Sequence, residues 1–120
     1  MNSKKKTTEE IFNHHLEAFE KKDLSEIAAN FTEHSIFINS LGVIALGVDK
    51  IIEIYKQYFE SQEQGATSSI KTLIIEGDIV FLEWAGESPS YISEGVDTFV
   101  IREGYIYAQT AKFTVTPKSE

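Results

Sequence analysis

The residues best suited to acid-base chemistry in this sequence are an aspartate in a strand-like stretch and a histidine in a helix-like one. Asp97 lies in EGVDTFVIREGYI (residues 94–106), where alternation predicts a strand with Asp97, Phe99 and Ile101 on one face. A carboxylate there faces either a cavity or a costly apolar environment, because desolvation disfavours its charged form. His15 lies within an apolar helical stripe. Asp97 and His15 are therefore the candidate catalytic residues, and a buried structural hydrogen bond is the alternative role.

The elements that position these two residues follow from the periodicity of apolar side chains. Thr7 and Glu10 have the spacing of a capping box, which predicts a helix start. Apolar residues at spacings of three and four then predict one helix to about residue 22 and two more over residues 24–31 and 49–62. The period changes to two after residue 69. The expected strands cover residues 35–39, 43–46, 70–76, 79–87, 94–102 and 105–115.

Helices followed by a run of antiparallel strands predict an α+β domain, with the helices on one face of a curved sheet. In the last strand, Gln109, Ala111 and Phe113 are expected to share one face with Tyr107. These stripes predict that one cavity collects several side chains. Its expected members are His15, Tyr55, Asp97, Phe99, Gln109 and Phe113.

Length and composition limit the remaining choices. The 120 residues suit a single domain, with short flexible tails at about residues 1–6 and 116–120. A net charge of -8 leaves no basic surface for nucleic acid. The absence of cysteine excludes disulfides and thiolate chemistry, and no apolar run reaches the length of a membrane helix. We therefore expect a soluble cytoplasmic protein without nucleic-acid or membrane partners.

A metal site is not expected, and no cofactor is predicted. His14 and His34 have no acidic residue at ligand spacing on the same helical face. Several aromatic side chains, among them Tyr58, Phe81 and Trp84, are either core residues or part of a cavity wall.

The order and spacing of these segments resemble the nuclear transport factor 2 (NTF2)-like superfamily, and within it the SnoaL-like or ketosteroid-isomerase-like proteins. The similarity rests on KKDLSEIAANFTEHSIF, LGVIALGVDKIIEIYKQYF, GDIVFLEWAGES and GVDTFVIREGYI and spans about residues 8–113. It implies a cone in which three N-terminal helices pack on a strongly curved, mainly antiparallel sheet over an internal cavity, commonly in a homodimer. The superfamily includes isomerases, dehydratases, hydrolases, cyclases and non-catalytic binders, so the resemblance alone does not choose a function.

The resemblance assigns roles to individual residues. In ketosteroid isomerases, an Asp in the strand that corresponds to residues 94–102 stays protonated and donates a hydrogen bond to the substrate oxyanion. Asp97, in VDTF, matches it. The Tyr that is the second donor falls on His15, and the Asp that is the general base falls on or next to Asn39. Asn39 has no titratable acceptor, so steroid isomerisation is not expected. Arg102, the only arginine, lies in a hairpin turn, so the Asp-Arg-Asp set of epoxide hydrolases is absent.

The ionisation of Asp97 depends on whether His15 reaches it. Without a nearby cation, burial raises the pKa of Asp97, and the neutral acid can donate a hydrogen bond to a ligand carbonyl. An ion pair with His15 would instead lower the pKa of Asp97 and raise that of His15. We expect the pair, because the Asn at the usual base position leaves His15 as the nearest titratable partner.

Two classes of function remain open. One is an isomerase, dehydratase or cyclase that acts on a hydrophobic carbonyl compound through Asp97 and His15. The other is a ligand-binding or dimerisation module that keeps the cone without the catalytic base. A homodimer is expected from the apolar residues on the face of the sheet that helices cannot cover. The candidate ligand-binding residues are Asn39, Tyr55, Tyr58, Phe81, Trp84, Phe99, Gln109 and Phe113.

Overall fold

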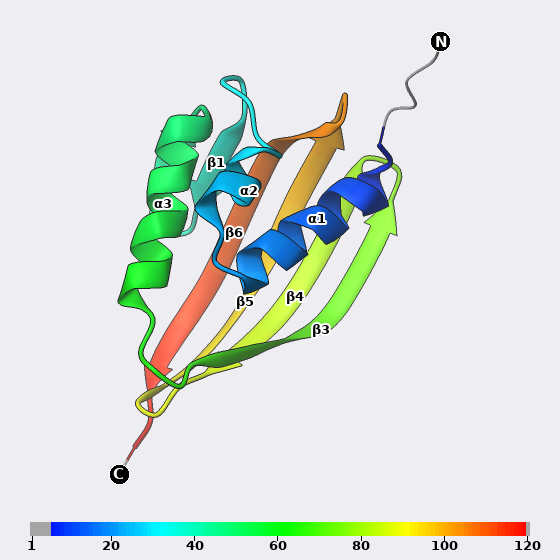
Figure 1. Ribbon diagram of the computed structural model, residues 1–120. Helices are drawn as coiled ribbons and strands as arrows, with labels where there is room; N and C mark the ends of the chain where they lie inside the picture. The colour runs from blue at the N-terminus through cyan, green and yellow to red at the C-terminus, as the bar shows by residue number, and fades with distance from the viewer. Residues whose placement is uncertain (1–5, 120) are drawn as a thin grey trace.

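The computed structural model describes residues 6–119, and three helices pack on one face of a six-stranded sheet (Figure 1). Most of the expected flexible N-terminal tail, and residue 120, lie outside the described residues. The elements are α1 (Thr8–Glu20), α2 (Leu24–Ala28), β1 (Ile36–Asn39), β2 (Ile44–Leu46), α3 (Val48–Ser61), β3 (Thr67–Glu76), β4 (Ile79–Glu87), β5 (Tyr91–Arg102) and β6 (Tyr105–Pro117).

The sheet has the strand order β2-β1-β6-β5-β4-β3. Strand β1 runs parallel to β6, and every other neighbouring pair is antiparallel. In Figure 1, α1 crosses β4 and β5, α3 lies beside β1, and the strands curve and extend beyond the helices at one end. The predicted α+β cone with a mainly antiparallel sheet is therefore confirmed.

Local sequence signals fix the helix starts. The Thr7 hydroxyl accepts from the Glu10 amide over 3.1 Å, and the Glu10 carboxylate accepts from the Thr7 amide over 2.8 Å, which is the predicted capping box. Asp23 caps α2 in the same way through the amide of Glu26. Helix α2 ends at Ala28, three residues before the predicted end, and the backbone turns so that the amide of Ile106 bonds to Asn30.

The side of the sheet that faces the helices is called the inner face here. Alternation along β4 buries Val80 and Leu82 there and leaves Phe81 37% exposed on the opposite, outer face. The prediction that Phe81 lines the ligand cavity is therefore wrong, because Phe81 is out of phase with Leu82 and Trp84.

An irregularity in the β5–β6 ladder changes the phase of β6. The register shifts between Val100 and Ile101, and Ile101 pairs with Ile106 rather than with Tyr107. Ile106 is fully buried, while Tyr107 is 42% exposed and carries the Arg102 guanidinium over its ring. The predicted grouping of Tyr107 with Gln109 is therefore wrong, and the bulge is the reason.

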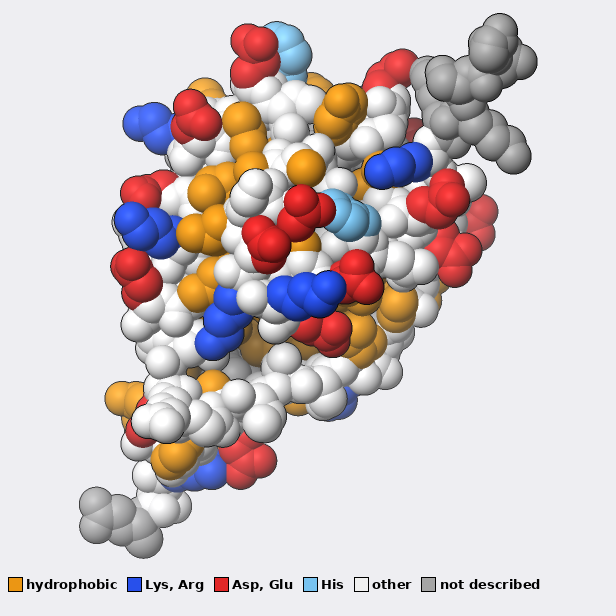
Figure 2. Space-filling view, in the orientation of Figure 1, with side chains coloured by type: hydrophobic (Ala, Val, Ile, Leu, Met, Phe, Trp, Pro, Cys, Tyr) orange, Lys and Arg blue, Asp and Glu red, His pale blue; other side chains and the backbone are white. Residues whose placement is uncertain are grey.

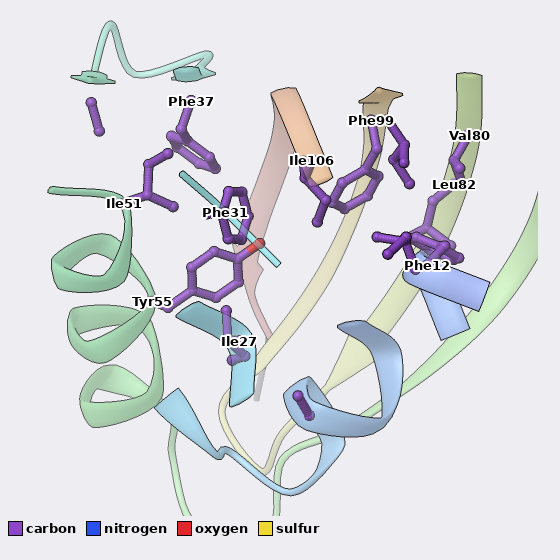
Figure 3. Packing of buried hydrophobic residues seen from close by; sticks show 14 residues of the cluster. Phe12, Ile27, Phe31, Phe37, Ile51, Tyr55, Val80, Leu82, Phe99 and Ile106 are labelled. Atoms are coloured by element: carbon purple, nitrogen blue, oxygen red, sulfur yellow. The ribbon is translucent and has the colours of Figure 1, made fainter. Parts of the chain in front are cut away.

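The core lies between the helices and the upper part of the inner face. Figure 3 shows Phe12 of α1 and Tyr55 of α3 directed toward side chains of the sheet, Phe99 among them. The Phe12 and Phe99 rings meet edge to face with centroids 5.1 Å apart. The helices are thereby anchored over β4, β5 and β6.

The strands at the lower end of the sheet are longer than predicted. Strand β6 continues to Pro117, and Lys118 donates to the Glu87 carboxylate over 2.8 Å. The expected tail from residue 116 is therefore partly an ordered strand. The ladder between β5 and β6 includes Tyr91 opposite Pro117.

Candidate functional site

A relay of hydrogen bonds joins the two candidate catalytic residues through two others. Asp97 Oδ2 accepts from Gln109 Nε2 over 2.9 Å, and Gln109 Oε1 accepts from the Tyr55 hydroxyl over 2.6 Å. The Tyr55 oxygen lies 3.3 Å from His15 Nε2. Helices α1 and α3 supply His15 and Tyr55, and β5 and β6 supply Asp97 and Gln109. We call these four residues the relay.

The second oxygen of Asp97 is held by Trp84. The indole Nε1 donates to Asp97 Oδ1 over 3.0 Å from the neighbouring strand β4. This approach requires Gly95 in β5, because a Cβ at that position would lie 2.5 Å from Cζ2 of Trp84. The absence of a side chain at Gly95 therefore allows the indole to reach the carboxylate.

His15 is neutral in this environment. Burial lowers its pKa to about 4, and the nearby charge of His14 adds to the effect. Its ring lies among aromatic rings with centroid distances between 5.2 and 6.5 Å, from Phe12, Phe19, Phe31, Tyr55 and Phe99. Nδ1 of His15 is buried and has no hydrogen-bond partner among the described residues.

Asp97 does not form the expected ion pair with His15. Burial raises its pKa, and the hydrogen bonds from Trp84 and Gln109 offset part of this rise. The prediction that His15 pairs directly with Asp97 is wrong, since Tyr55 and Gln109 stand between them and both pKa shifts have the opposite sign. Burial, with the charge of Asp97, also raises the pKa of Tyr55, which keeps the phenol protonated.

The inner face is open beside Asp97. Ile70 pairs with Trp84 and Leu73 with Leu82, so both point to the inner side, yet they are 46% and 39% exposed. Tyr58 of α3 is 39% exposed, and burial and the Asp97 charge raise its pKa. Figure 2 shows the surface hollowed in the lower half of the molecule, with apolar side chains at the back of the hollow.

We call this region the open inner face. It consists of Tyr58, Ile70, Leu73, Trp84 and Phe113, with Asp97 at its border. Phe113 pairs with Gly95 and is half-buried. An apolar concave surface with one convergent carboxyl group is typical of small-molecule sites.

Asn39, a candidate ligand-binding residue, lies elsewhere, and so does the acidic side chain of Glu83. The Asn39 side-chain oxygen accepts from the amides of Leu41 and Val43 and so shapes the β1–β2 turn. Glu83 shares the outer parity of Phe81 and accepts from the Thr72 hydroxyl over 2.8 Å. Thus the structure gathers His15, Tyr55, Asp97 and Gln109 into one network, places Phe99 against His15, and gives Asn39 a turn role.

Two other hollows are surface features. One of about 430 Å³ lies between the start of α1 and the hairpin turns at Asp78 and Gly104, and one of about 240 Å³ lies beside His14 and Glu26. His15 and Asp97 line neither. Among residues 6–119, no cluster of three or more acidic or histidine side chains is arranged for a metal ion. In the same range, no helix is long and apolar enough to cross a membrane.

Sequence reasoning missed the bond between Trp84 and Asp97 and the linking role of Gln109. The sequence predicts Trp84 as a core or ligand-binding aromatic residue, but it does not predict its hydrogen-bond partner, because that partner depends on strand pairing. The signal that could have found it is Gly95, two residues before Asp97 in the strand that pairs with Trp84. A glycine inside a strand often marks a close approach of another group.

Residues 12–109 match the SnoaL-like domain family. No curated protein matches the sequence significantly. Among solved structures, a protein from Kribbella flavida provisionally named a ketosteroid isomerase superposes with a TM-score of 0.76 at 10% identity, covering 94% of this chain and 82% of the other.

Two further structures have the same fold. An NTF2-like protein of unknown function from Cytophaga hutchinsonii has a TM-score of 0.74 at 13% identity, with 95% of each chain covered. A protein from Shewanella denitrificans provisionally named a SnoaL-like polyketide cyclase has a TM-score of 0.71 at 13% identity, covering 89% of this chain and 90% of the other. These likenesses establish the fold, and the site decides the chemistry.

Proposed function

Because the chain belongs to the SnoaL-like domain family, we propose that its open inner face binds a small hydrophobic carbonyl compound and that Asp97 moves a proton on it. The observation that carries this proposal is the position of Asp97 at the border of an exposed apolar surface, with both carboxylate oxygens held by Trp84 and Gln109. Two N–H donors fix the carboxylate, while burial raises its pKa and so makes it a stronger base.

The reaction class is proton transfer next to a carbonyl group. The Asp97 carboxylate removes a proton from the carbon beside the carbonyl, and the electrons of that C–H bond form an enolate. In isomerisation, the resulting carboxylic acid returns the proton to another carbon of the enolate system. In cyclisation, the enolate carbon attacks a second carbonyl of the same compound, and the carboxylic acid gives its proton to the alkoxide that forms. Asp97 thus acts as the base in the first step and as the acid in the second, so one carboxyl group serves both proton transfers.

A non-catalytic ligand binder is the second candidate. One observation favours it: the position where the resemblance places the general base holds Asn39. Its amide side chain does not titrate, and its oxygen accepts hydrogen bonds within the β1–β2 turn. Neutral His15 with its pKa of about 4 is also a weak base near pH 7. On this reading, the compound binds the open inner face and leaves unchanged.

Hydrogen-deuterium exchange of 2-tetralone, followed by NMR in D₂O, separates the two candidates. We expect the wild-type protein to accelerate exchange beside the carbonyl and Asp97→Asn to lose about 100-fold or more of this acceleration. Glu94→Gln is the matched control, because Glu94 is an exposed acid in the same strand. Binding without any accelerated exchange would support the non-catalytic candidate and refute proton transfer.

We also propose that the outer face joins two copies of the chain. Exposed apolar residues occur on the outer side of β1, β2, β3 and β4, and strand pairing makes the face continuous through β5 and β6. The helices cover only the inner side, so this surface meets water in a single chain. The residues of this outer patch are Ile38, Ile44, Leu46, Ile74, Ile79 and Phe81.

A further inference from the structure

The hydrogen bonds of the relay have one direction. Tyr55 has a single hydroxyl hydrogen and donates it to Gln109 Oε1 over 2.6 Å. The Tyr55 oxygen must therefore accept from His15, which makes Nε2 of His15 the protonated nitrogen. A neutral imidazole carries one N–H, so Nδ1 of His15 is a bare acceptor.

This acceptor has no donor within residues 6–119. Nδ1 is buried without a partner among the described residues, and the side chains packed on the ring are hydrocarbon rings apart from Tyr55, whose hydrogen is used. A buried acceptor that lacks a donor is costly, and such groups in native proteins are usually satisfied by water or a ligand. The low pKa of His15 supports the neutral form.

The aromatic wall around His15 continues to the open inner face. The His15 ring packs against Phe19, the Phe19 ring lies 5.8 Å from that of Tyr58, and Tyr58 is exposed at the border of this surface. His15 is 3% exposed and lines neither hollow, so a ligand that enters over Tyr58 reaches the imidazole only by displacing the Phe19 ring. At the other end of the relay, Asp97 borders the same surface.

We propose that Nδ1 of His15 accepts a hydrogen bond from a hydroxyl group of the ligand, so that the compound bound is a hydroxylated aromatic or alicyclic molecule. This inference rests on the proposed function, since it concerns the same site, and it adds a functional group to the ligand. A carbonyl oxygen does not fit beside Nδ1 because two acceptors repel. The hydroxyl donor and the carbonyl beside Asp97 then lie at different ends of one ligand.

The test compares 2-naphthol with 2-methoxynaphthalene, which has the same ring system without the donor. By isothermal titration calorimetry, we expect the wild-type protein to prefer 2-naphthol by about tenfold or more, and His15→Phe to lose this preference. In ¹⁵N NMR of the wild-type protein, 2-naphthol should move the Nδ1 signal of His15. The signals of His14 and His34 serve as internal controls, and this readout does not depend on whether a variant folds.

Three results would overturn the inference. One is equal affinity for the two compounds, which leaves the apolar site in place without the hydroxyl contact. Another is a preference for 2-naphthol that persists in His15→Phe and disappears in Asp97→Asn. That result would mean that the ligand hydroxyl group bonds to Asp97 and not to His15. The third is an unmoved Nδ1 signal at saturation, as expected for a bound water in that position. If neither compound binds, the inference fails, and titration with the ketone 2-tetralone decides whether the proposed function fails as well.

Discussion

The indole nitrogen of Trp84 donates to Asp97 over 3.0 Å, and Trp84 is the only tryptophan in the chain. The carboxylate is thus fixed from β4 on one oxygen and from β6, through Gln109, on the other. Any change that moves the indole should therefore alter both the pKa of Asp97 and the fluorescence of the protein.

Gly95→Ala should displace Trp84. The added Cβ would lie 2.5 Å from the indole and 2.8 Å from the carbonyl oxygen of Lys112, neither of which can yield without a shift of ring or backbone. We expect a loss of about 1–3 kcal/mol in the free energy of unfolding, measured by urea denaturation, and a change in tryptophan emission. Gly86→Ala is the control, because its nearest conflict is the Ser93 hydroxyl, which can turn away. Equal losses in the two variants would contradict this account of Gly95.

His15 should make the protein sensitive to acid. Its folded pKa of about 4 lies below the ordinary 6.5, so the unfolded chain binds a proton that the folded protein excludes. The contribution of neutral His15 is complete above pH 6.5 and is lost as the pH falls toward 4, and it amounts to about 3 kcal/mol. Urea denaturation at several pH values should show this loss in wild type and a smaller one in His15→Phe.

The control for His15 is His34→Gln, since His34 is exposed. This variant should keep the acid sensitivity of the wild-type protein. A His15→Phe variant with an unchanged pH profile would mean that His15 is accessible to protons in the folded state.

Asp97 should act on stability in the opposite direction. Because its folded pKa is raised, the folded protein holds the proton more tightly than the unfolded chain. Stability therefore falls as the pH rises from the ordinary carboxyl value of 3.8 through the raised pKa. Asp97→Asn should remove this fall, so its unfolding free energy at pH 7 relative to pH 4 should exceed that of the wild-type protein. Identical pH slopes would argue against a raised pKa.

The outer patch predicts a dimer that a single charge can separate. Size-exclusion chromatography with light scattering at micromolar concentration should give twice the 13.5 kDa of one chain. Phe81→Glu places a carboxylate in the β4 part of the outer patch, between Ile74 and the strands of the sheet centre, and should yield single chains without loss of helical circular dichroism. Glu76→Gln, at an exposed position near the turn of the same hairpin, should stay dimeric. A wild-type mass of one chain would end the proposal.

The fold was predictable because its signals are local. The capping box at Thr7 and Glu10, the helical stripes and the alternation in β4 each depend on neighbours in sequence. Strand ends were less predictable, as the extension of β6 to Pro117 illustrates, since strand ends depend on pairing.

The site was only partly predictable because its bonds cross the sheet. Strand alternation correctly predicts that Gln109 lies on the same face of the sheet as Asp97. The change of phase that exposes Tyr107 comes from a bulge that the local sequence pattern does not predict. The distance between His15 and Asp97 depends on how far α1 stands from β5. Packing of whole elements sets this distance, and it left room for Tyr55 and Gln109 between the two residues.

The most direct test of the ligand site is the indole N–H signal of Trp84 in proton NMR during titration with 2-tetralone. A single tryptophan gives a single indole signal, and its hydrogen bond to Asp97 makes it a reporter of that carboxylate. The account predicts a saturable shift of this signal, together with nuclear Overhauser contacts from the ligand to the Trp84 ring. An indole signal that stays in place while 2-tetralone binds, or a failure of 2-tetralone to bind at its solubility limit, would contradict a ligand site at Asp97.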